Sequence, residues 1–195
     1  PLETRADLEA FRRLAPFERL AVLIDPRSLA QNPDVPAAAA AAARELGLRL
    51  DLVLLAETAA ATLAAIPPEA DAVYLTPALA LDEAEVQALI DGLTARRLPS
   101  FSMAGIEDVR RGVLAARRGE YRDRLVRRLA LNLQRMLGGA APETLPVRVE
   151  PSVRLVLNAR TASAVGLNLP YRVLHHADIL HLADTELGSP ITLAS

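Results

Sequence analysis

The chain has 195 residues and a net charge of −2, with 51% hydrophobic and 24% charged residues. That is ordinary globular composition, long enough to bury roughly 70% of the unfolded surface. A charge this small gives no field that would attract nucleic acid or an acidic membrane, and no apolar run approaches the roughly 18 residues of a membrane span. There is no cysteine, and all 22 basic residues are arginine. Thiol catalysis, disulfides, cysteine-based zinc sites, Schiff-base chemistry and the P-loop lysine are therefore excluded.

The first elements alternate between helix and strand. An amphipathic helix is predicted over 2–14, because Leu8 and Phe11 fall on one stripe, and Pro16 ends it. The continuous apolar run Arg19–Ile24 is typical of a strand covered on both faces.

A helix–strand–helix unit follows. Asp34 is expected to cap an alanine-rich helix that stops at Gly47. A strand is predicted over 48–55. Thr58 then opens a short helix, which Pro67 closes.

The centre of the chain carries the clearest pattern. Two short apolar runs, 72–75 and 100–103, predict strands. Between them lies a helix whose apolar positions share one face, and a further helix opens at Ile106. The apolar positions of the intervening helix are Val86, Leu89, Ile90 and Leu93.

The remainder is predicted as a long helix, a strand and two further helices. The long helix spans Arg117–Leu137, and its core stripe is expected to be Leu125, Leu129, Leu133 and Met136. An alternating segment, 147–157, predicts an edge strand interrupted at Pro151. Asn158 is expected to cap a short helix, and the tail 171–181 is expected to be helical.

Repeated β-α units predict an α/β fold of three layers, a doubly wound and mostly parallel sheet. In such sheets ligands bind just beyond the carboxyl ends of the strands. Helix amino termini and hydroxyl groups at that rim favour an anion, and Arg27 could grip a carboxylate. The candidate ligand-binding residues are Arg27, Ser28, Thr58, Thr76, Ser102 and Gly105. The alternative is that these residues are ordinary caps and turns.

Other patterns favour structural roles. His175, His176 and His181 lie close together, but no pair has the i, i+4 spacing of two metal ligands on a helix. The arginine-rich tract 110–135 contains acidic residues and a single aromatic, Tyr121, so a solvated helix face is favoured over nucleic-acid binding. Asp25 follows a strand, as a phosphoacceptor aspartate does, but the accompanying acidic pair and lysine are missing. No cofactor, metal or catalytic residue is predicted.

The order of motifs resembles a known family. These motifs are LAVLIDP, DAVYLTP, LPSFSMAGIEDVRRGVLAA, LNLQRMLGG and LPVRVEPSVRLVLNARTASAVGLNLP. Together they resemble the carboxyl-terminal lobe and tail of the substrate-binding proteins of ABC transporters that are related to binders of tryptophan and other small molecules. Those proteins resemble type I periplasmic binding proteins, in which two α/β lobes close on a ligand.

The resemblance implies a domain organisation. Residues 1–18 correspond to the crossover helix that follows an amino-terminal lobe, 19–170 to the ligand-binding lobe, and 171–195 to a tail. An amino-terminal lobe is therefore expected to precede this chain, and the tail resembles a junction to an outer-membrane efflux-channel domain. The chain departs from the family at 77–80, where an aspartate and small polar residues are usual, and at Leu125 and Leu129, where glycines are common.

The leading hypothesis is a periplasmic, non-catalytic solute-binding component of an ABC-type transport system. Its expected partners are a small-molecule ligand, the amino-terminal lobe and the membrane subunits of the transporter, and no nucleic acid. The alternative is an interaction or scaffold lobe that has lost its ligand and self-associates through an apolar rim, 77–81. An enzyme is the third choice, because no nucleophile and base can be paired in the sequence.

Overall fold

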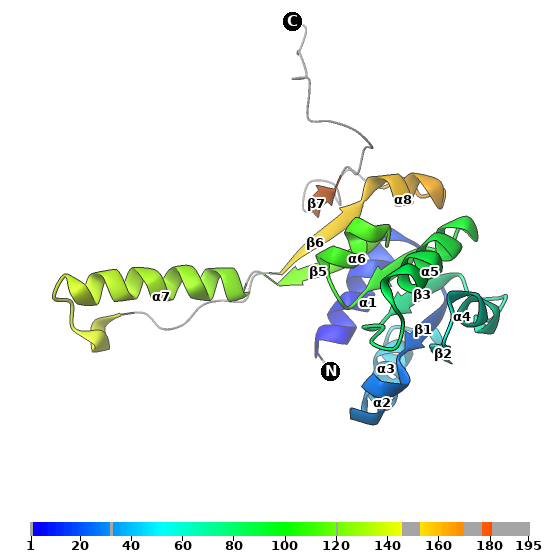
Figure 1. Ribbon diagram of the computed structural model, residues 1–195, viewed down its shortest axis with the longest axis horizontal. Coiled ribbons are helices and arrows are strands. Elements are labelled where there is room, and N and C mark those ends of the chain that lie inside the picture. Colours follow the sequence, from blue (N-terminus) through cyan, green and yellow to red (C-terminus); the bar gives the residue numbers. More distant parts are fainter. Residues whose placement is uncertain (1, 32, 120, 146–152, 170–176, 181–195) are drawn as a thin grey trace, which may run out of the picture.

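The computed structural model describes residues 2–31, 33–119, 121–145, 153–169 and 177–180, which form a seven-stranded sheet in the order β2-β1-β3-β4-β5-β6-β7 (Figure 1). The strands are β1 (Arg19–Ile24), β2 (Arg49–Leu54), β3 (Ala72–Leu75), β4 (Ser100–Ser102), β5 (Ala115–Gly119), β6 (Val153–Asn158) and β7 (Ala177–Leu180). Strands β1 to β5 are parallel, β6 is antiparallel to β5, and β7 is parallel to β6. The predicted α/β fold with a mostly parallel sheet is confirmed.

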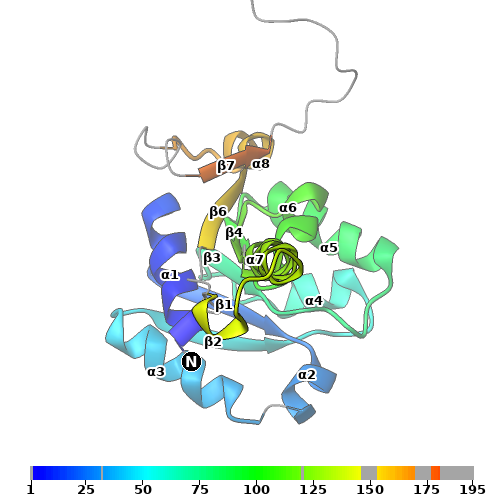
Figure 2. The same ribbon diagram turned by 90° about the vertical axis from the view of Figure 1, so that its left-hand side faces the viewer.

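Helices cover both faces of the sheet. They are α1 (Leu2–Leu14), α2 (Pro26–Gln31), α3 (Val35–Glu45), α4 (Ala59–Ala65), α5 (Glu83–Ala95), α6 (Ile106–Arg111), α7 (Tyr121–Leu137) and α8 (Ala159–Ala164), with a 3-10 turn at Pro142–Thr144. Figure 2 shows α1 and α3 on one side of the sheet and α4, α5 and α6 on the other. The result is the predicted three-layer arrangement.

Strand β1 shows why both faces are covered. All of its residues after Arg19 are buried. Leu20 and Val22 belong to the core shared with α1 and α3, whereas Ala21 and Leu23 belong to the core shared with α4 and α5. Because successive side chains of a strand point to opposite faces, an unbroken apolar run needs a helical layer on each side.

Helix α1 is held against the sheet by aromatic side chains. The ring of Phe11 lies 4.7 Å from that of Phe17 and 5.3 Å from that of Phe101 on β4, measured between centroids. Leu8 and Leu14 are buried in the same core. The predicted helix and its apolar stripe are therefore confirmed.

Polar contacts connect the strands at the edge of the sheet where the amino ends of β1, β2 and β3 lie, opposite the predicted site. The Asp71 carboxylate accepts hydrogen bonds from the backbone N–H groups of Glu18 and Arg19 at 3.0 and 2.9 Å. The Arg19 guanidinium donates to Asp51 on the neighbouring strand at 2.6 Å. This hydrogen bond raises the pKa of Arg19 above its ordinary value, so the side chain stays charged.

The prediction for 117–137 is wrong in two respects. Residues 115–119 form β5, because they extend the sheet beside β4 and β6, and the helix begins only at Tyr121. The expected core stripe is turned outward, since Leu129 and Leu133 are 56% and 57% exposed. Helix α7 projects from the sheet as an arm (Figure 1). The apolar spacing correctly indicates an amphipathic helix but cannot show that its apolar face lies away from this core.

Two further predictions near the carboxyl end are corrected. Strand β6 is not an edge strand, because it lies between β5 and β7. Within the tail that the sequence predicts as helical, Ala177–Leu180 pairs with β6 as a strand. Residues 146–152, 170–176 and 181–195 lie outside the described part of the chain.

The cap predicted at Asn158 is confirmed. Its Oδ1 accepts a hydrogen bond from the Thr161 N–H at 3.0 Å, while its Nδ2 donates to the Val109 carbonyl at 2.9 Å. The Thr161 hydroxyl donates to the Gly112 carbonyl. These bonds fasten α8 to the end of α6. Within the described residues, none of the helices combines the length and apolarity needed to cross a membrane.

Candidate functional site

Three loops meet where β1, β3 and β4 end. The backbone N–H of Asp25 donates to the Thr76 hydroxyl at 3.4 Å, and that hydroxyl donates to the Leu23 carbonyl at 3.0 Å. The Met103 N–H donates to the carbonyl of Leu75 at 2.9 Å. The loops therefore share one rim of the sheet, as the parallel strand pattern predicts.

A buried carboxylate organises this rim. Asp25 is 0% exposed, and its two oxygens accept hydrogen bonds from the backbone N–H groups of Arg27 at 2.7 Å and Ala80 at 2.6 Å. One side chain thus joins the start of α2 to the loop that follows β3. Charge-assisted bonds of this kind stabilise a buried carboxylate that would otherwise be costly.

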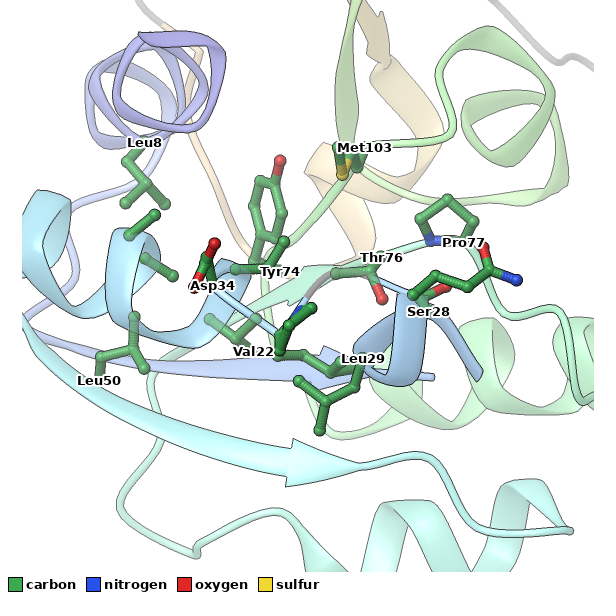
Figure 3. Close-up of a pocket in the computed structure, with 16 residues that line it drawn as sticks. Leu8, Val22, Ser28, Leu29, Asp34, Leu50, Tyr74, Thr76, Pro77 and Met103 are labelled. Carbon is green, nitrogen blue, oxygen red and sulfur yellow. The ribbon is translucent and has the colours of Figure 1, made fainter. Parts of the chain in front are cut away.

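A cavity of ≈ 470 Å³ adjoins the rim on the face of the sheet that carries α1 and α3 (Figure 3). Small-molecule pockets typically have volumes of about 300–1,000 Å³ and mostly apolar walls. Its walls come from β1, β2, β3, the three helices α1, α2 and α3, and the loops after β3 and β4. The lining residues are Leu8, Val22, Ile24, Ser28, Leu29, Gln31, Pro33, Asp34, Val35, Ala38, Ala39, Leu50, Tyr74, Thr76, Pro77 and Met103.

Strand alternation brings alternate residues of β1 and β3 to this cavity. Val22 and Ile24 line it from β1, and Tyr74 and Thr76 from β3 and its end. The Tyr74 hydroxyl donates to Asp7 on α1 at 2.7 Å, so its ring is held in the wall. Most of the lining is hydrocarbon, which suits a ligand with a sizeable apolar body.

Asp34 carries the single formal charge among the described residues that line the cavity. It precedes α3, but the predicted cap is wrong: its backbone is already helical, with φ −82° and ψ −11°, and its side chain makes no capping hydrogen bond. In Figure 3 its carboxylate is directed toward the side of the cavity where Leu8 and Tyr74 lie. A negative group therefore faces a cavity whose other lining residues are uncharged and mostly apolar.

Comparison with known proteins identifies the architecture. No protein-family model and no curated protein matches the sequence. Among solved structures, an ABC domain in complex with L-Trp from Streptococcus pneumoniae has a TM-score of 0.65 at 19% identity, over 91% of this chain and 60% of that one. A ligand-free, open substrate-binding protein with adhesive properties from Clostridium difficile has a TM-score of 0.68 at 16% identity, over 89% and 58%. A conserved domain protein from Vibrio cholerae has a TM-score of 0.64 at 22% identity, over 90% and 59%.

The chain has the type I periplasmic-binding-protein-like fold. The resemblance inferred from its motifs is thus confirmed at the level of the fold. The chain spans about three fifths of the length of these structures, so it represents part of the architecture that they contain.

In this binding-protein-like fold, the predicted ligand residues fall into two groups. Ser28 and Thr76 line the cavity, although the Thr76 hydroxyl is engaged by backbone groups on both sides. Arg27 lies next to the cavity without lining it, because its guanidinium donates to the Leu79 carbonyl at 3.1 Å.

The other predicted residues lie elsewhere on the rim. Thr58 caps α4 by accepting a hydrogen bond from the Ala61 N–H. Ser102 donates to the Asp108 carboxylate and accepts from the Ala104 N–H. Gly105 precedes α6 with a φ of +93°, a conformation that glycine adopts without strain. None of these lines the described cavity, and their role in binding stays a prediction.

Sequence reasoning misses the walls of the cavity. Period-two alternation can group Val22 with Ile24 and Tyr74 with Thr76, but nothing in the pattern shows that the helices leave space over that face. The position of Asp34 indicates a cap, which is the commoner role of an aspartate before a helix.

The other patterns give no second site within the described residues. No group of three or more histidine, aspartate or glutamate residues there could hold a metal ion. The histidines at 175, 176 and 181 lie outside those residues. In the arginine tract, Arg110 pairs with Glu107 at the surface, whereas Arg117 pairs with Asp7 against the sheet rather than lying on a solvated helix face.

Proposed function

We propose that this chain forms the larger part of a non-catalytic solute-binding protein of an ABC-type transport system. The observation that carries the proposal is the ≈ 470 Å³ cavity at the carboxyl rim of the sheet, where α/β proteins of this type bind ligands. The fold is that of structures that include a substrate-binding protein and a domain in complex with L-Trp. The cavity walls offer apolar contact and few polar groups, which suits binding rather than chemical conversion.

The arm formed by α7 supports a two-lobed protein. Strand β5 leaves the sheet at the carboxyl rim, and the arm extends from there (Figure 1). Its exposed large apolar residues are Val126, Leu129, Leu131, Leu133, Met136 and Leu137. About two fifths of the neighbouring structures lies outside the matched region. A second lobe of that size, placed above the cavity, would cover the arm and enclose the ligand.

The proposal extends to partners and location. A binding protein of this kind delivers its ligand to the membrane subunits of the transporter and works in the periplasm. The charge of −2 on the whole chain fits a small-molecule cargo better than nucleic acid, which is bound through a strongly positive surface.

Calorimetric titration of the full chain tests the binding role. A panel of amino acids, amines and small carboxylates is titrated into the protein, and small-angle scattering is recorded with and without the best binder on a protein that also carries the second lobe. Saturable heat from at least one compound, together with a smaller radius of gyration, supports the proposal. No heat from any class of compound contradicts it.

The second candidate function is an interaction module without a small ligand. The outward-facing apolar side of α7 favours it, because contiguous exposed apolar surface commonly marks a protein interface. The segment 77–81, which the sequence predicts to self-associate, contributes Leu79, which is 55% exposed. Sedimentation velocity separates the two candidates: concentration-dependent dimers without any ligand response favour the module.

A further inference from the structure

Resting on the binding role proposed above, we propose that the cavity selects a small organic cation, an amine carried on an apolar body, over a carboxylate of the same shape. Two features of the rim carry this inference: the charge that faces the cavity, and the way the rim uses its own anion-binding groups.

The attractive element is Asp34. Its carboxylate faces a cavity whose remaining lining is uncharged, and it makes no capping bond with α3. Asp34 is exposed to solvent, and among the described residues no hydrogen bond or ion pair engages its carboxylate, although its backbone carbonyl accepts from the Ala38 N–H. A ligand ammonium placed beside it gains a charge-assisted hydrogen bond, while the apolar body of the ligand covers Val22 and Leu29. The aromatic ring of Tyr74 in the same wall also favours a cation.

Three of the helix starts at this rim, those of α2, α4 and α5, already have side chains of the chain itself bonded to their N–H groups, whereas the start of α3 has no such side-chain cap. The Asp25 carboxylate accepts hydrogen bonds from the N–H groups of Arg27, at the start of α2, and Ala80. At α4, Thr58 accepts from Ala61, and Glu85 accepts from Ala59.

The start of α5 is capped in the same way, since the Asp82 carboxylate accepts a hydrogen bond from the backbone N–H of Glu85. A ligand carboxylate arriving at these helix starts would find N–H groups already bonded and several carboxylates nearby.

The guanidinium that could have held a carboxylate is also directed elsewhere. Arg27 Nη1 donates to the Leu79 carbonyl at 3.1 Å, outside the cavity. No arginine occurs among the cavity-lining residues within the described ranges. The cavity therefore lacks the positive partner that a free carboxylate needs when it leaves water.

Matched probe pairs test the proposal on the full chain. Each pair shares an apolar body and differs in charge: tryptamine with indole-3-propionate, phenethylamine with 3-phenylpropionate, and hexylamine with hexanoate. We expect each amine to bind about tenfold or more tightly than its partner, which corresponds to one charge-assisted hydrogen bond.

Two variants test whether the preference for amines depends on the Asp34 carboxylate. Asp34→Asn keeps the shape of the side chain and removes its charge, so amine binding should weaken about tenfold while 3-methylindole, a neutral probe, is unaffected. Glu57→Gln is the matched control. It removes one exposed carboxylate that follows β2 and does not line the cavity, and it should leave amine binding within about twofold. Circular dichroism melting confirms that both variants fold.

The outcomes separate this inference from the binding role. Tighter binding of amines that depends on Asp34 supports the inference. Carboxylates that bind as well as the amines, or amine binding unchanged in Asp34→Asn, overturn it while leaving a solute-binding role in place. If all the probes, including 3-methylindole, fail to bind at millimolar concentration, both the inference and the cavity as a binding site are rejected.

Discussion

The Tyr74 hydroxyl donates a hydrogen bond to Asp7 Oδ2 at 2.7 Å, which ties the first helix to the centre of the sheet. Asp7 Oδ1 also receives the Arg117 guanidinium at 2.8 Å, so one carboxylate joins α1, β3 and β5. The side chains of Arg117 and Asp7 are only 21% and 11% exposed. This connection fixes one wall of the cavity, because Tyr74 and Leu8 both line it.

Removing the hydroxyl tests that connection. Tyr74→Phe should lower the free energy of unfolding by about 1.5 kcal/mol, because a hydrogen bond to a charged group is lost while the ring still packs. Asp7→Ala should cost about 3 kcal/mol, since it also leaves a largely covered guanidinium without this partner. Urea denaturation measures both changes. Equal stability of wild type and Tyr74→Phe would show that the bond contributes nothing.

The Asp25 carboxylate stabilises the carboxyl rim of the sheet by joining the start of α2 to the loop after β3. Asp25→Ala should lower the free energy of unfolding by about 3 kcal/mol, because two partly buried hydrogen bonds from the backbone N–H groups of Arg27 and Ala80 lose their charged acceptor. Asp25→Asn retains one acceptor oxygen and should cost less. Asp91→Asn, at an exposed position on α5, is the control and should change stability by less than about 0.5 kcal/mol. The prediction fails if Asp25→Ala is no worse than the control.

A glycine controls the turn from α6 into β5. Gly112 has a φ of +121°, and a Cβ there would lie 3.2 Å from Ile90 Cγ2. Gly112→Ala should therefore cost about 2 kcal/mol through backbone strain and crowding. At Gly47, φ is +68° and a Cβ would meet no atom within 4 Å, so Gly47→Ala should cost about 1 kcal/mol. Thermal melts of the two variants test this prediction: Gly112→Ala should lower the melting temperature more than Gly47→Ala. A larger decrease in Gly47→Ala would contradict it.

Substitution of an exposed leucine on the α7 arm should cost far less stability than truncation of a buried leucine in the core. Leu133→Glu on α7 should change the free energy of unfolding of this chain by less than about 0.5 kcal/mol, because the side chain is 57% exposed. Leu89→Ala on α5 should cost about 3 kcal/mol, because that leucine is fully buried. Any self-association seen by sedimentation should weaken in Leu133→Glu. A large loss of stability in that variant would mean that α7 packs on the body in solution.

Much of the fold can be predicted from local patterns. The apolar run of β1 and the helical spacing of Leu89, Ile90 and Leu93 correctly indicate buried elements, since periodicity reports which face of an element is apolar. Asn158 is correctly identified as a cap because its side chain acts on the adjacent backbone. These features depend on residues close in sequence.

What cannot be predicted depends on distant partners. The stripe of Leu129 and Leu133 has helical spacing whether it packs on this sheet or on another surface. Residues 115–119 form a strand because β4 and β6 lie beside them. The cavity exists because helices from separate parts of the chain leave space over β1 and β3. Asp34, whose side chain makes no capping bond with α3, is one of its lining residues.

Backbone amide NMR during titration with tryptamine tests the central claim, that the carboxyl-rim cavity is the solute-binding site. The account predicts saturable shift changes at the amides of Ser28, Val35 and Thr76, with α8 unaffected. Changes confined to α7, or scattered without saturation over both faces of the sheet, would contradict it.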